Sequence, residues 1–217
     1  MKTIRTLLLL GLVGSIMGSI SDVLLLYSPN GGYFDQTYNF MNDISFGRLL
    51  PAQLIGVPFL PFQILGFIAI YLLYRKKLPK LSLAMLALSS WAMCMGTAYH
   101  SMLAFVNIYK QSEGLYVKEI FYQENFGLIR ILNEPFAAFV VIGFTISCLI
   151  IAWGIYKTNV LPKWVAFCVP TTFYALIGLL YMAGTSVGNF LVMTGFNLSI
   201  GLFFIVVLSQ LGKVKLN

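Results

Sequence analysis

Long apolar runs constrain this sequence more than any other feature. About 20 residues of helix are needed to cross the hydrocarbon core of a bilayer. Six runs reach that length, and they cover residues 7–27, 51–74, 81–109, 135–156, 162–183 and 187–211. Only 10% of the 217 residues are charged, whereas a soluble domain carries about 25%. The sequence therefore predicts an all-α integral membrane protein, a six-helix transmembrane bundle that forms a single domain over residues 1–217.

The segments that join these runs alternate in charge. One set holds ten cations and no acid: Lys2, Arg5, Arg75, Lys76, Lys77, Lys80, Lys157, Lys163, Lys213 and Lys215. The other set holds four cations and seven acids: Arg48, Lys110, Lys118 and Arg130 with Asp22, Asp35, Asp43, Glu113, Glu119, Glu124 and Glu134. Cytoplasmic loops carry the excess of Lys and Arg, so both termini are predicted to be cytoplasmic. We expect a multi-pass protein of the cell membrane, the cytoplasmic membrane of a bacterium, and no nucleic-acid partner.

The first run admits two interpretations. Lys2 and Arg5, followed by an apolar stretch and the small residues 19–21, resemble a secretory signal peptide with a cleavage site. The apolar residues continue to Leu26, however, which makes the run long enough to span a membrane. Gly14 and Gly18 form a GxxxG pair, and small residues at that spacing let helices approach closely. This face favours a helix that packs inside the bundle.

Three ionisable residues lie within the runs or at their ends: Asp22, His100 and Glu134. A charged side chain at the centre of a membrane helix costs about +2.5 to +3.5 kcal/mol, so such residues usually face the protein interior. All three fall in the outer half of the predicted bundle. We predict that they line an outward-facing polar pocket as catalytic acid–base residues, with Asp22 facing His100. Hydrogen bonding between helices is the structural alternative for Asp22 and His100, and capping of the helix at Pro135 is the alternative for Glu134.

Three further polar residues are candidates for ligand binding: Arg48, Gln53 and Asn197. Arg48 precedes the second run, where it either neutralises Asp22 or Glu134 or meets lipid phosphate. Gln53 lies on the second run, and Asn197 lies deep in the last one. The sequence leaves open which of these side chains reach the pocket.

Prolines and small residues add local expectations. Pro58 and Pro61 should kink the second helix, because each removes a backbone hydrogen bond. Gly96, one turn before His100, indicates a close contact between helices at that point.

The cysteines and the single histidine limit the chemistry. Cys94, Cys148 and Cys168 each lie within an apolar run, which favours a packing role over a disulfide or a redox site. His100 is the only histidine, which excludes metal sites built from two or more histidines. We expect neither a metal nor another cofactor.

Two outer segments are long enough to contribute structure. Residues 27–48 are expected to fold over Asp22 and His100. Residues 110–134 include aromatic and aliphatic positions that predict either a short amphipathic helix on the membrane surface or a cap on the bundle.

Acid–base chemistry on an amphipathic small molecule or lipid fits this set of residues best, with membrane lipids as partners. Histidine titrates near neutrality, which suits it to proton transfer. A serine nucleophile is less supported, because no GxSxG motif occurs. The alternatives are a small-solute or proton-coupled transporter, or a non-enzymatic membrane assembly or immunity factor. The sequence leaves open whether the protein is an enzyme, and it does not determine the oligomeric state.

Three segments carry a resemblance to a known family. They are GSISDVLLLYSPNGGY (residues 18–33), RLLPAQLIGVPFLPFQILG (residues 48–66) and YHS (residues 99–101). With these segments the sequence resembles an uncharacterised bacterial family of multi-pass membrane proteins, a domain of unknown function. The resemblance covers most of the chain and implies a multi-pass fold, but it implies no activity.

Overall fold

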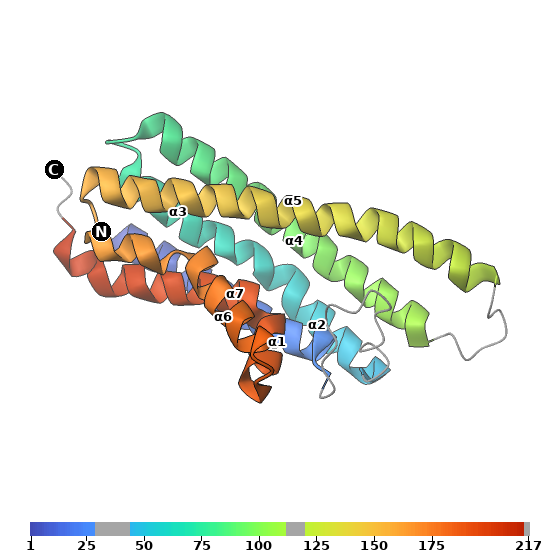
Figure 1. Ribbon diagram of the computed structural model, residues 1–217. Helices are drawn as coiled ribbons and strands as arrows, with labels where there is room; N and C mark the ends of the chain where they lie inside the picture. The colour runs from blue at the N-terminus through green and yellow to red at the C-terminus, as the bar shows by residue number, and fades with distance from the viewer. Residues whose placement is uncertain (29–43, 112–119, 215–217) are drawn as a thin grey trace.

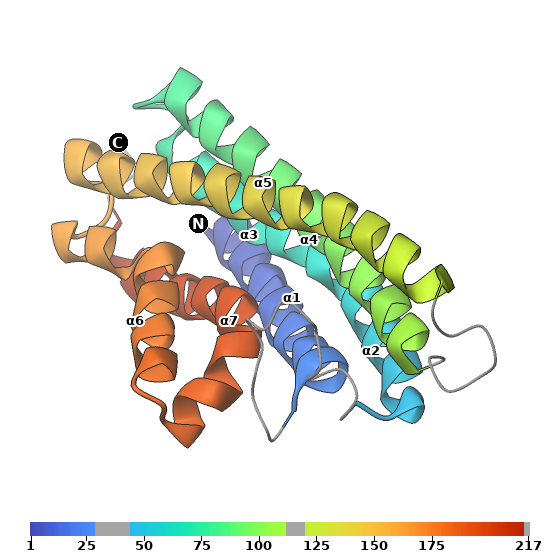
Figure 2. The ribbon, with the colours of Figure 1, turned by 45° about the vertical axis from the view of Figure 1, so that its right-hand side comes forward.

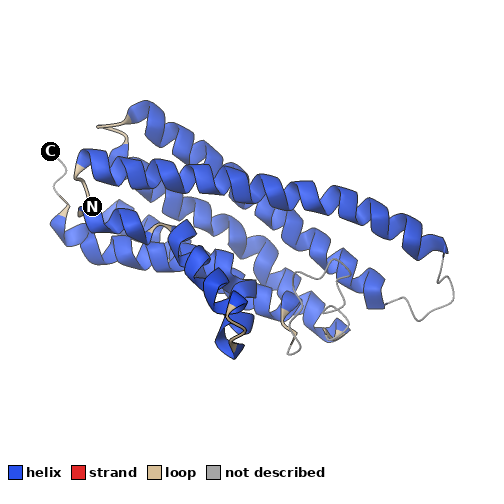
Figure 3. Ribbon diagram, viewed as in Figure 1, coloured by secondary structure: helices blue, strands red, loops and turns tan. Residues whose placement is uncertain are grey.

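A computed structural model describes residues 1–28, 44–111 and 120–214, and it describes side chains for all of these except residues 106–137. The elements in this part of the chain are helical (Figure 3). The α-helices are α1 (Lys2–Leu26), α2 (Phe46–Phe59), α3 (Gln63–Tyr74), α4 (Pro79–Gln111), α5 (Ile120–Thr158), α6 (Pro170–Met182) and α7 (Ser186–Gln210). Three short 3₁₀ helices accompany them: η2 (Leu60–Phe62), η4 (Lys163–Cys168) and η5 (Leu211–Lys213). The predicted all-α fold class is confirmed.

Five helical segments of the described chain are long and apolar enough to cross a membrane. They are Lys2–Leu26, Phe46–Tyr74, Pro79–Phe105, Ala138–Thr158 and Ser186–Lys213. Each corresponds to one of the six apolar runs. These lengths and compositions are those of a membrane-embedded helical bundle.

The remaining run, residues 162–183, is not one continuous helix. It is divided into η4 and the 13-residue helix α6, which at 1.5 Å per residue is only about 20 Å long. The division falls at Val169, whose backbone is extended (ψ 154°), immediately before Pro170. Proline disfavours the helical conformation in the residue that precedes it, which explains the break. The segment predicted to be the fifth transmembrane helix is therefore not a continuous, full-length span.

Helix α5 also differs from the expected boundary. It begins at Ile120 and continues without interruption to Thr158, so Pro135 lies inside the helix (Figure 1). The prediction that Glu134 caps a helix starting at Pro135 is therefore wrong, as is a separate surface helix over the residues from Ile120 onward. One proline removes a single backbone hydrogen bond, a loss that membrane helices tolerate when neighbouring groups compensate. The side chain of Glu134 lies outside the described residues.

The second span is broken where its prolines predicted. Helix α2 ends at Phe59, η2 covers the next three residues, and α3 begins at Gln63. Pro58 lies inside α2 and Pro61 lies within η2. The chain changes there from α-helical to 3₁₀ hydrogen bonding and back. The predicted kink in the second helix is confirmed.

Helix α1 lies inside the bundle and contacts α2, α3 and α7. A Cβ atom added to Gly11 would lie 2.7 Å from the Cα atom of Gly66, and one added to Gly14 would lie 2.9 Å from the carbonyl oxygen of Phe59. A Cβ atom on Gly18 would lie 2.7 Å from the Leu60 side chain. The small-residue face predicted for this helix therefore packs against the broken helix α2–η2–α3.

The other helices pack in pairs. Helix α4 runs along α5, and α6 packs on α7 while scarcely touching α5. Figure 2 shows α6 and α7 diverging from the α4–α5 pair. The bundle is therefore least closed along the line where α6 faces α5.

One end of the bundle is cationic. Helix α1 begins there, α7 ends there, and the connections from α3 to α4 and from α5 to η4 lie there (left in Figure 1). This cationic end carries nine exposed basic residues of the described chain: Lys2, Arg5, Arg75, Lys76, Lys77, Lys80, Lys157, Lys163 and Lys213. The only acid whose side chain the structure describes, Asp22, lies 20 helical residues after Lys2, about 30 Å away. The basic residues of the acid-free connecting segments therefore lie together at one end of the described bundle.

The cysteines take three different environments. Cys148 is buried, Cys168 is half-buried and Cys94 is exposed on α4, and all three are free thiols. The expectation of a packing role is thus wrong for Cys94, whose helix turns this position outward from the bundle.

Candidate functional site

Asp22 and His100 face each other across the interior of the bundle. Asp22 lies near the C-terminal end of α1 and His100 lies on α4. Asp22 Oδ1 is 3.4 Å from His100 Nδ1, and both residues are buried, with exposures of 7% and 3%. The predicted approach of the carboxylate and the ring is confirmed. A buried carboxylate next to an imidazole is a pair that can hold and transfer a proton.

The second ring nitrogen of His100 contacts Ser21. His100 Nε2 is 2.7 Å from Ser21 Oγ, and the Ser21 hydroxyl donates a hydrogen bond of 2.5 Å to the carbonyl oxygen of Ala52 on α2. Ser21 is fully buried. Both polar atoms of the ring are thus engaged by neighbouring residues of α1. Sequence reasoning did not single out Ser21, although its position next to Asp22 was a usable signal.

Gly56 makes this contact possible. A Cβ atom added to Gly56 would lie 2.5 Å from His100 Nε2 and would also collide with Ser21 Oγ. The absence of a side chain on α2 therefore lets α1 and α4 meet at this level. Sequence reasoning placed the close contact at Gly96 instead, where an added Cβ atom would meet no described atom within 4 Å. The close contact predicted at Gly96 is therefore not found among the described residues.

Two amide side chains extend the site from the other oxygen of Asp22. Asn197 Nδ2 on α7 donates a hydrogen bond of 2.6 Å to Asp22 Oδ2. Gln63 Nε2, at the start of α3, donates one of 2.6 Å to Asn197 Oδ1. Gln63 is completely buried, and its Oε1 has no partner within the described chain. Asn197 thus contacts the predicted acid directly, and the break in the second span supplies the next residue, Gln63.

Arg48 and Gln53 contact backbone atoms near the site. The Arg48 guanidinium donates to the carbonyl oxygens of Val23 at 2.6 Å and Tyr27 at 3.1 Å, at the C-terminal end of α1. A cation there also interacts favourably with the helix dipole. The expectation that Arg48 neutralises a carboxylate is not met among the described residues, where the ionic partner of Asp22 is His100. Gln53 Nε2 lies 3.4 Å from the backbone carbonyl of His100, not from its ring.

We call these five buried side chains the polar cluster: Ser21, Asp22, Gln63, His100 and Asn197. The cluster joins α1, α3, α4 and α7, and Ser21 links it to the backbone of α2. Residues 29–43, predicted to fold over it, and the side chain of Glu134, predicted to join it, lie outside the described residues. The catalytic and ligand-binding roles of the predicted residues remain predictions.

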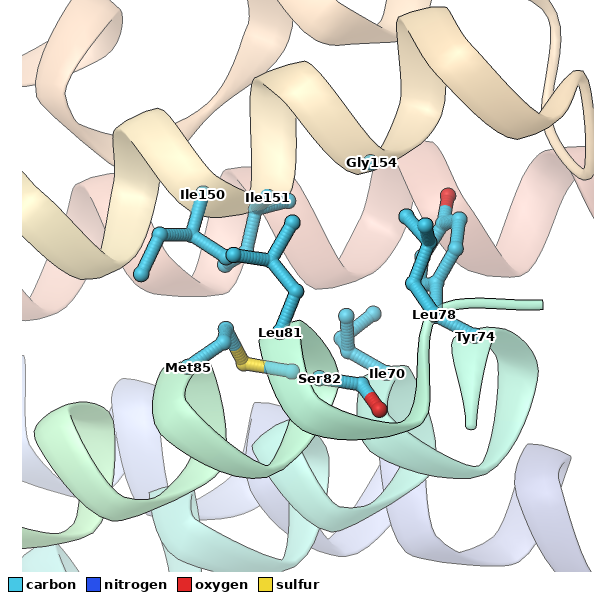
Figure 4. A pocket seen from close by; sticks show the side chains of 9 residues that line it. All are labelled: Ile70, Tyr74, Leu78, Leu81, Ser82, Met85, Ile150, Ile151 and Gly154. Atoms are coloured by element: carbon cyan, nitrogen blue, oxygen red, sulfur yellow. The ribbon is translucent and has the colours of Figure 1, made fainter. Parts of the chain in front are cut away.

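Two pockets occur elsewhere in the described part of the bundle. The first has a cavity volume of only about 10 Å³, lies between α3, α4 and α5 towards the cationic end (Figure 4) and is lined by Ile70, Tyr74, Leu78, Leu81, Ser82, Met85, Ile150, Ile151 and Gly154. The second has a cavity volume of about 20 Å³, lies between α5, α6 and α7 and is lined by Val141, Phe144, Thr145, Thr171, Tyr174, Phe196 and Ser199. The polar cluster lines neither pocket. Its members are packed against one another instead.

The second pocket lies close to the polar cluster. Its lining includes Phe196 and Ser199 of α7, which precede and closely follow Asn197 of the cluster in the sequence. Its lining mixes aromatic surface with hydroxyl groups. Among the described residues, no group of three or more His, Cys, Asp or Glu side chains comes together as a metal site would require.

Comparison with known proteins gives one match. No curated protein and no solved structure matches this chain. The model of a family of unknown function, DUF6796, matches residues 1–214. This match covers nearly the entire chain and agrees with the resemblance carried by the three segments named above. The chain therefore belongs to the DUF6796 family, a family of unknown function.

Proposed function

We propose that this protein uses Asp22 and His100 for acid–base chemistry on an amphipathic small molecule or lipid within the membrane. The observation that carries the proposal is the 3.4 Å approach of the Asp22 carboxyl to the His100 ring inside an apolar bundle. Ionisable groups are costly in such surroundings, and those that persist usually serve a function. An imidazole next to a carboxyl group can take a proton from one atom of a substrate and return it to another.

The substrate class follows from the surroundings of the pair. The lining between α5, α6 and α7 offers aromatic surface together with the hydroxyl groups of Thr145 and Tyr174, which suits contact with a molecule that has both an apolar and a polar part. Its cavity volume of about 20 Å³ is close to what one water molecule needs, so binding is proposed to require α6, which scarcely touches α5, to move away from it. Binding there is proposed to bring the polar part of the substrate towards the polar cluster.

Lipid analysis of the purified protein tests this proposal. The full-length protein is purified in nanodiscs made from total bacterial lipid, and the lipids that copurify and change with time are identified by mass spectrometry. We expect one lipid class to be enriched and converted by the wild-type protein, and not converted by Asp22→Asn or His100→Gln. Ser89→Ala removes a buried hydroxyl on the same helix as His100, away from the polar cluster, and serves as the matched control.

The outcomes separate the roles clearly. Conversion that is lost in both cluster variants and retained in Ser89→Ala supports the proposal. Conversion that survives in both cluster variants contradicts it. Enrichment of a lipid without any conversion leaves the binding part of the proposal and removes the catalytic part.

A proton-coupled transporter is the second candidate, and the broken helix favours it. Gln63 lies at the break between η2 and α3 and is connected through Asn197 to Asp22. Discontinuous helices next to buried polar residues often form the substrate and ion sites of transporters. Substrate-dependent acidification inside proteoliposomes, absent in Asp22→Asn, supports this candidate. Conversion of the substrate without its movement across the membrane contradicts it.

We also propose that the cationic end faces the cytoplasm, which places the polar cluster in the outer half of the membrane. The proposal rests on the gathering of nine basic residues at that end and on the preference of cytoplasmic loops for Lys and Arg. Labelling of single-cysteine variants from outside the cell tests it. A cysteine at position 30 or 112 should react with an impermeant reagent, whereas one at position 77 or 159 should not. The reverse pattern would invert the topology.

A further inference from the structure

We propose that the Asp22–His100 pair of the polar cluster binds one exchangeable proton in addition to the proton of the neutral imidazole, and that release of one proton from the pair turns the Ser21 hydroxyl from Ala52 to His100. The inference deepens the proposed function, because it specifies the protonation state from which acid–base chemistry starts. It rests on the geometry of the cluster alone and needs no substrate.

The first step concerns the single proton of the Ser21 hydroxyl. A backbone carbonyl oxygen can only accept a hydrogen bond, so the 2.5 Å contact between Ser21 Oγ and the Ala52 carbonyl requires the hydroxyl proton to lie between these two atoms. The same proton cannot also point at His100 Nε2, which lies 2.7 Å from Ser21 Oγ. His100 Nε2 must therefore carry a proton and donate it to Ser21 Oγ.

The second step concerns the opposite side of the ring. A neutral imidazole that is protonated on Nε2 has a lone pair on Nδ1. That lone pair would face the carboxyl oxygen of Asp22 at 3.4 Å, and it would repel a carboxylate. A proton between the two atoms removes the repulsion. It gives either an imidazolium with a carboxylate or an imidazole with a carboxylic acid.

The amide chain decides which carboxyl oxygen shares this proton. Asn197 donates to Asp22 Oδ2 and is itself oriented by the donor group of Gln63. Oδ2 is thus occupied as an acceptor, which leaves Oδ1 for the proton shared with His100. Asn197 and Gln63 are therefore positioning residues for this proton.

Burial favours the occupied site. With the proton bound, the Asp22–His100 pair has no net charge in either form. Without it, the pair carries one negative charge in surroundings where an uncompensated charge is strongly disfavoured. Among the described residues, the charged group near the pair is Arg48 of α2, which is held on carbonyls of α1, and Tyr174 of α6 adds an electrostatic interaction with Asp22. Within the described chain, α3 and α7 face it with the neutral amides of Gln63 and Asn197.

Release of the proton changes the hydrogen bonds in a defined way. The pair then keeps one proton, on Nδ1, where it is donated to the Asp22 carboxylate, so Nε2 is the position that is left without a proton. Nε2 becomes an acceptor, and among the described residues the hydroxyl that contacts it is that of Ser21. When Ser21 turns to donate to Nε2, its bond to Ala52 is lost. Proton release is thereby coupled to the contact between α1 and the broken helix that contains α2.

Nitrogen NMR of the single histidine tests the proposal. His100 is the only histidine in the chain, so the full-length protein grown with ¹⁵N-histidine gives two ring signals in bilayers, both from this residue. Spectra are recorded from about pH 5 to about pH 9, a range that brackets the ordinary histidine pKa of about 6.5. We expect Nε2 to be protonated at the acidic end and to be unprotonated at the alkaline end, where Nδ1 carries the ring proton.

Two variants complete the test. Ser21→Ala removes both the acceptor of the protonated Nε2 and the donor to the unprotonated Nε2, so the pH at which Nε2 loses its proton should differ from that of the wild type. Ser89→Ala, which alters a hydroxyl outside the cluster, should leave both signals and their pH dependence unchanged. An unprotonated Nε2 at the acidic end overturns the assignment of the Ser21 proton. An Nε2 that stays protonated throughout, or a Ser21→Ala profile identical to that of the wild type, overturns the switch.

These outcomes are independent of the proposed enzymatic function, because the spectra are recorded without substrate. A protein that shows the two protonation states but converts no lipid retains the proton site and loses the enzymatic proposal. A protein that converts lipid with Nε2 unprotonated from the start loses the proton switch and retains the catalytic pair.

Discussion

Helix α4 makes two buried polar contacts that differ in what they require from the rest of the bundle. At Ser89, the hydroxyl lies 2.5 Å from the hydroxyl of Ser147 on α5, and Ser147 also donates to the carbonyl of Met85 at 3.2 Å. At His100, eleven residues further along, the ring contacts two residues of α1. The first contact joins two helices. The second belongs to a cluster with members on four.

The difference follows from charge. A hydroxyl group is a donor and an acceptor at once, so two serines satisfy each other with a nearby carbonyl and leave no net charge. A carboxyl group and an imidazole change charge with protonation, and both states must be accommodated in an apolar interior. The cluster accordingly recruits Asn197 and Gln63 on one side and Ser21 on the other. The ionisable pair Asp22–His100 is thus surrounded by further hydrogen-bonding side chains, whereas the neutral pair Ser89–Ser147 needs only one nearby carbonyl.

The largest effect is expected from removing one member of the ionisable pair. His100→Leu leaves Asp22 buried without its ionic partner, which should lower the free energy of unfolding by about 3–5 kcal/mol. The double variant Asp22→Leu/His100→Leu removes both groups and should recover part of that loss. Unfolding of the protein in mixed micelles by increasing SDS, followed by circular dichroism, measures both. A double variant at least as unstable as the single one would show that the pair is not coupled.

A smaller effect is expected where the backbones must approach. Gly56→Ala places a Cβ atom 2.5 Å from His100 Nε2, and this overpacking should cost about 1–3 kcal/mol in the same SDS titration. Gly96→Ala is the matched control on α4, because within the described chain its Cβ atom would meet nothing closer than 4 Å. Alanine is the better helix former by up to about 1 kcal/mol, so the control should be neutral or stabilising. Equal destabilisation by the two substitutions would refute the close contact at Gly56.

The smallest effect is expected at the neutral contact. Ser147→Ala removes one hydroxyl of the Ser89–Ser147 pair and should cost about 0.6 kcal/mol, the average for hydrogen bonds between membrane helices. The remaining Ser89 hydroxyl can still turn towards groups of its own helix, which limits the loss. The SDS midpoint should therefore shift far less than for His100→Leu. A loss as large as that of His100→Leu would remove the distinction between neutral and ionisable contacts.

Much of the site was predictable because it depends on properties of single helices: their small-residue faces, their prolines and the depth of their ionisable residues. The GxxxG pair of Gly14 and Gly18 predicted the packed face of α1, and this face carries the helix into contact with α2 and η2. The approach of Asp22 to His100 followed from their similar depth in the membrane and from the cost of exposing either to lipid. Pro58 and Pro61 predicted the break that places Gln63.

Other features escaped because they depend on how helices cross. Arg48 was expected to meet either a carboxylate or lipid phosphate, but the end of α1 offers it two backbone carbonyls. Gly56 resembles other glycines in the sequence until α1 and α4 are brought against it. Proline can lie inside a helix, as Pro135 does in α5, or at the start of one, as Pro170 does in α6. The sequence alone did not distinguish these two positions.

The sequence by itself determined that the fold is all-α with helices long and apolar enough to cross a membrane, that its basic residues gather at one end, and that an acid and a histidine lie at a similar level of the bundle. These properties depend on the length, polarity and periodicity of single segments, which the order of residues contains directly. The tertiary structure decided which atoms meet: Ser21 with His100, Asn197 with Asp22, and Gln63 with Asn197. A helix can rotate about its axis and slide along it without changing its sequence pattern, whereas a hydrogen bond tolerates only a few tenths of an ångström. The packing of glycines and prolines between helices removes that freedom, and it is an outcome of the whole bundle.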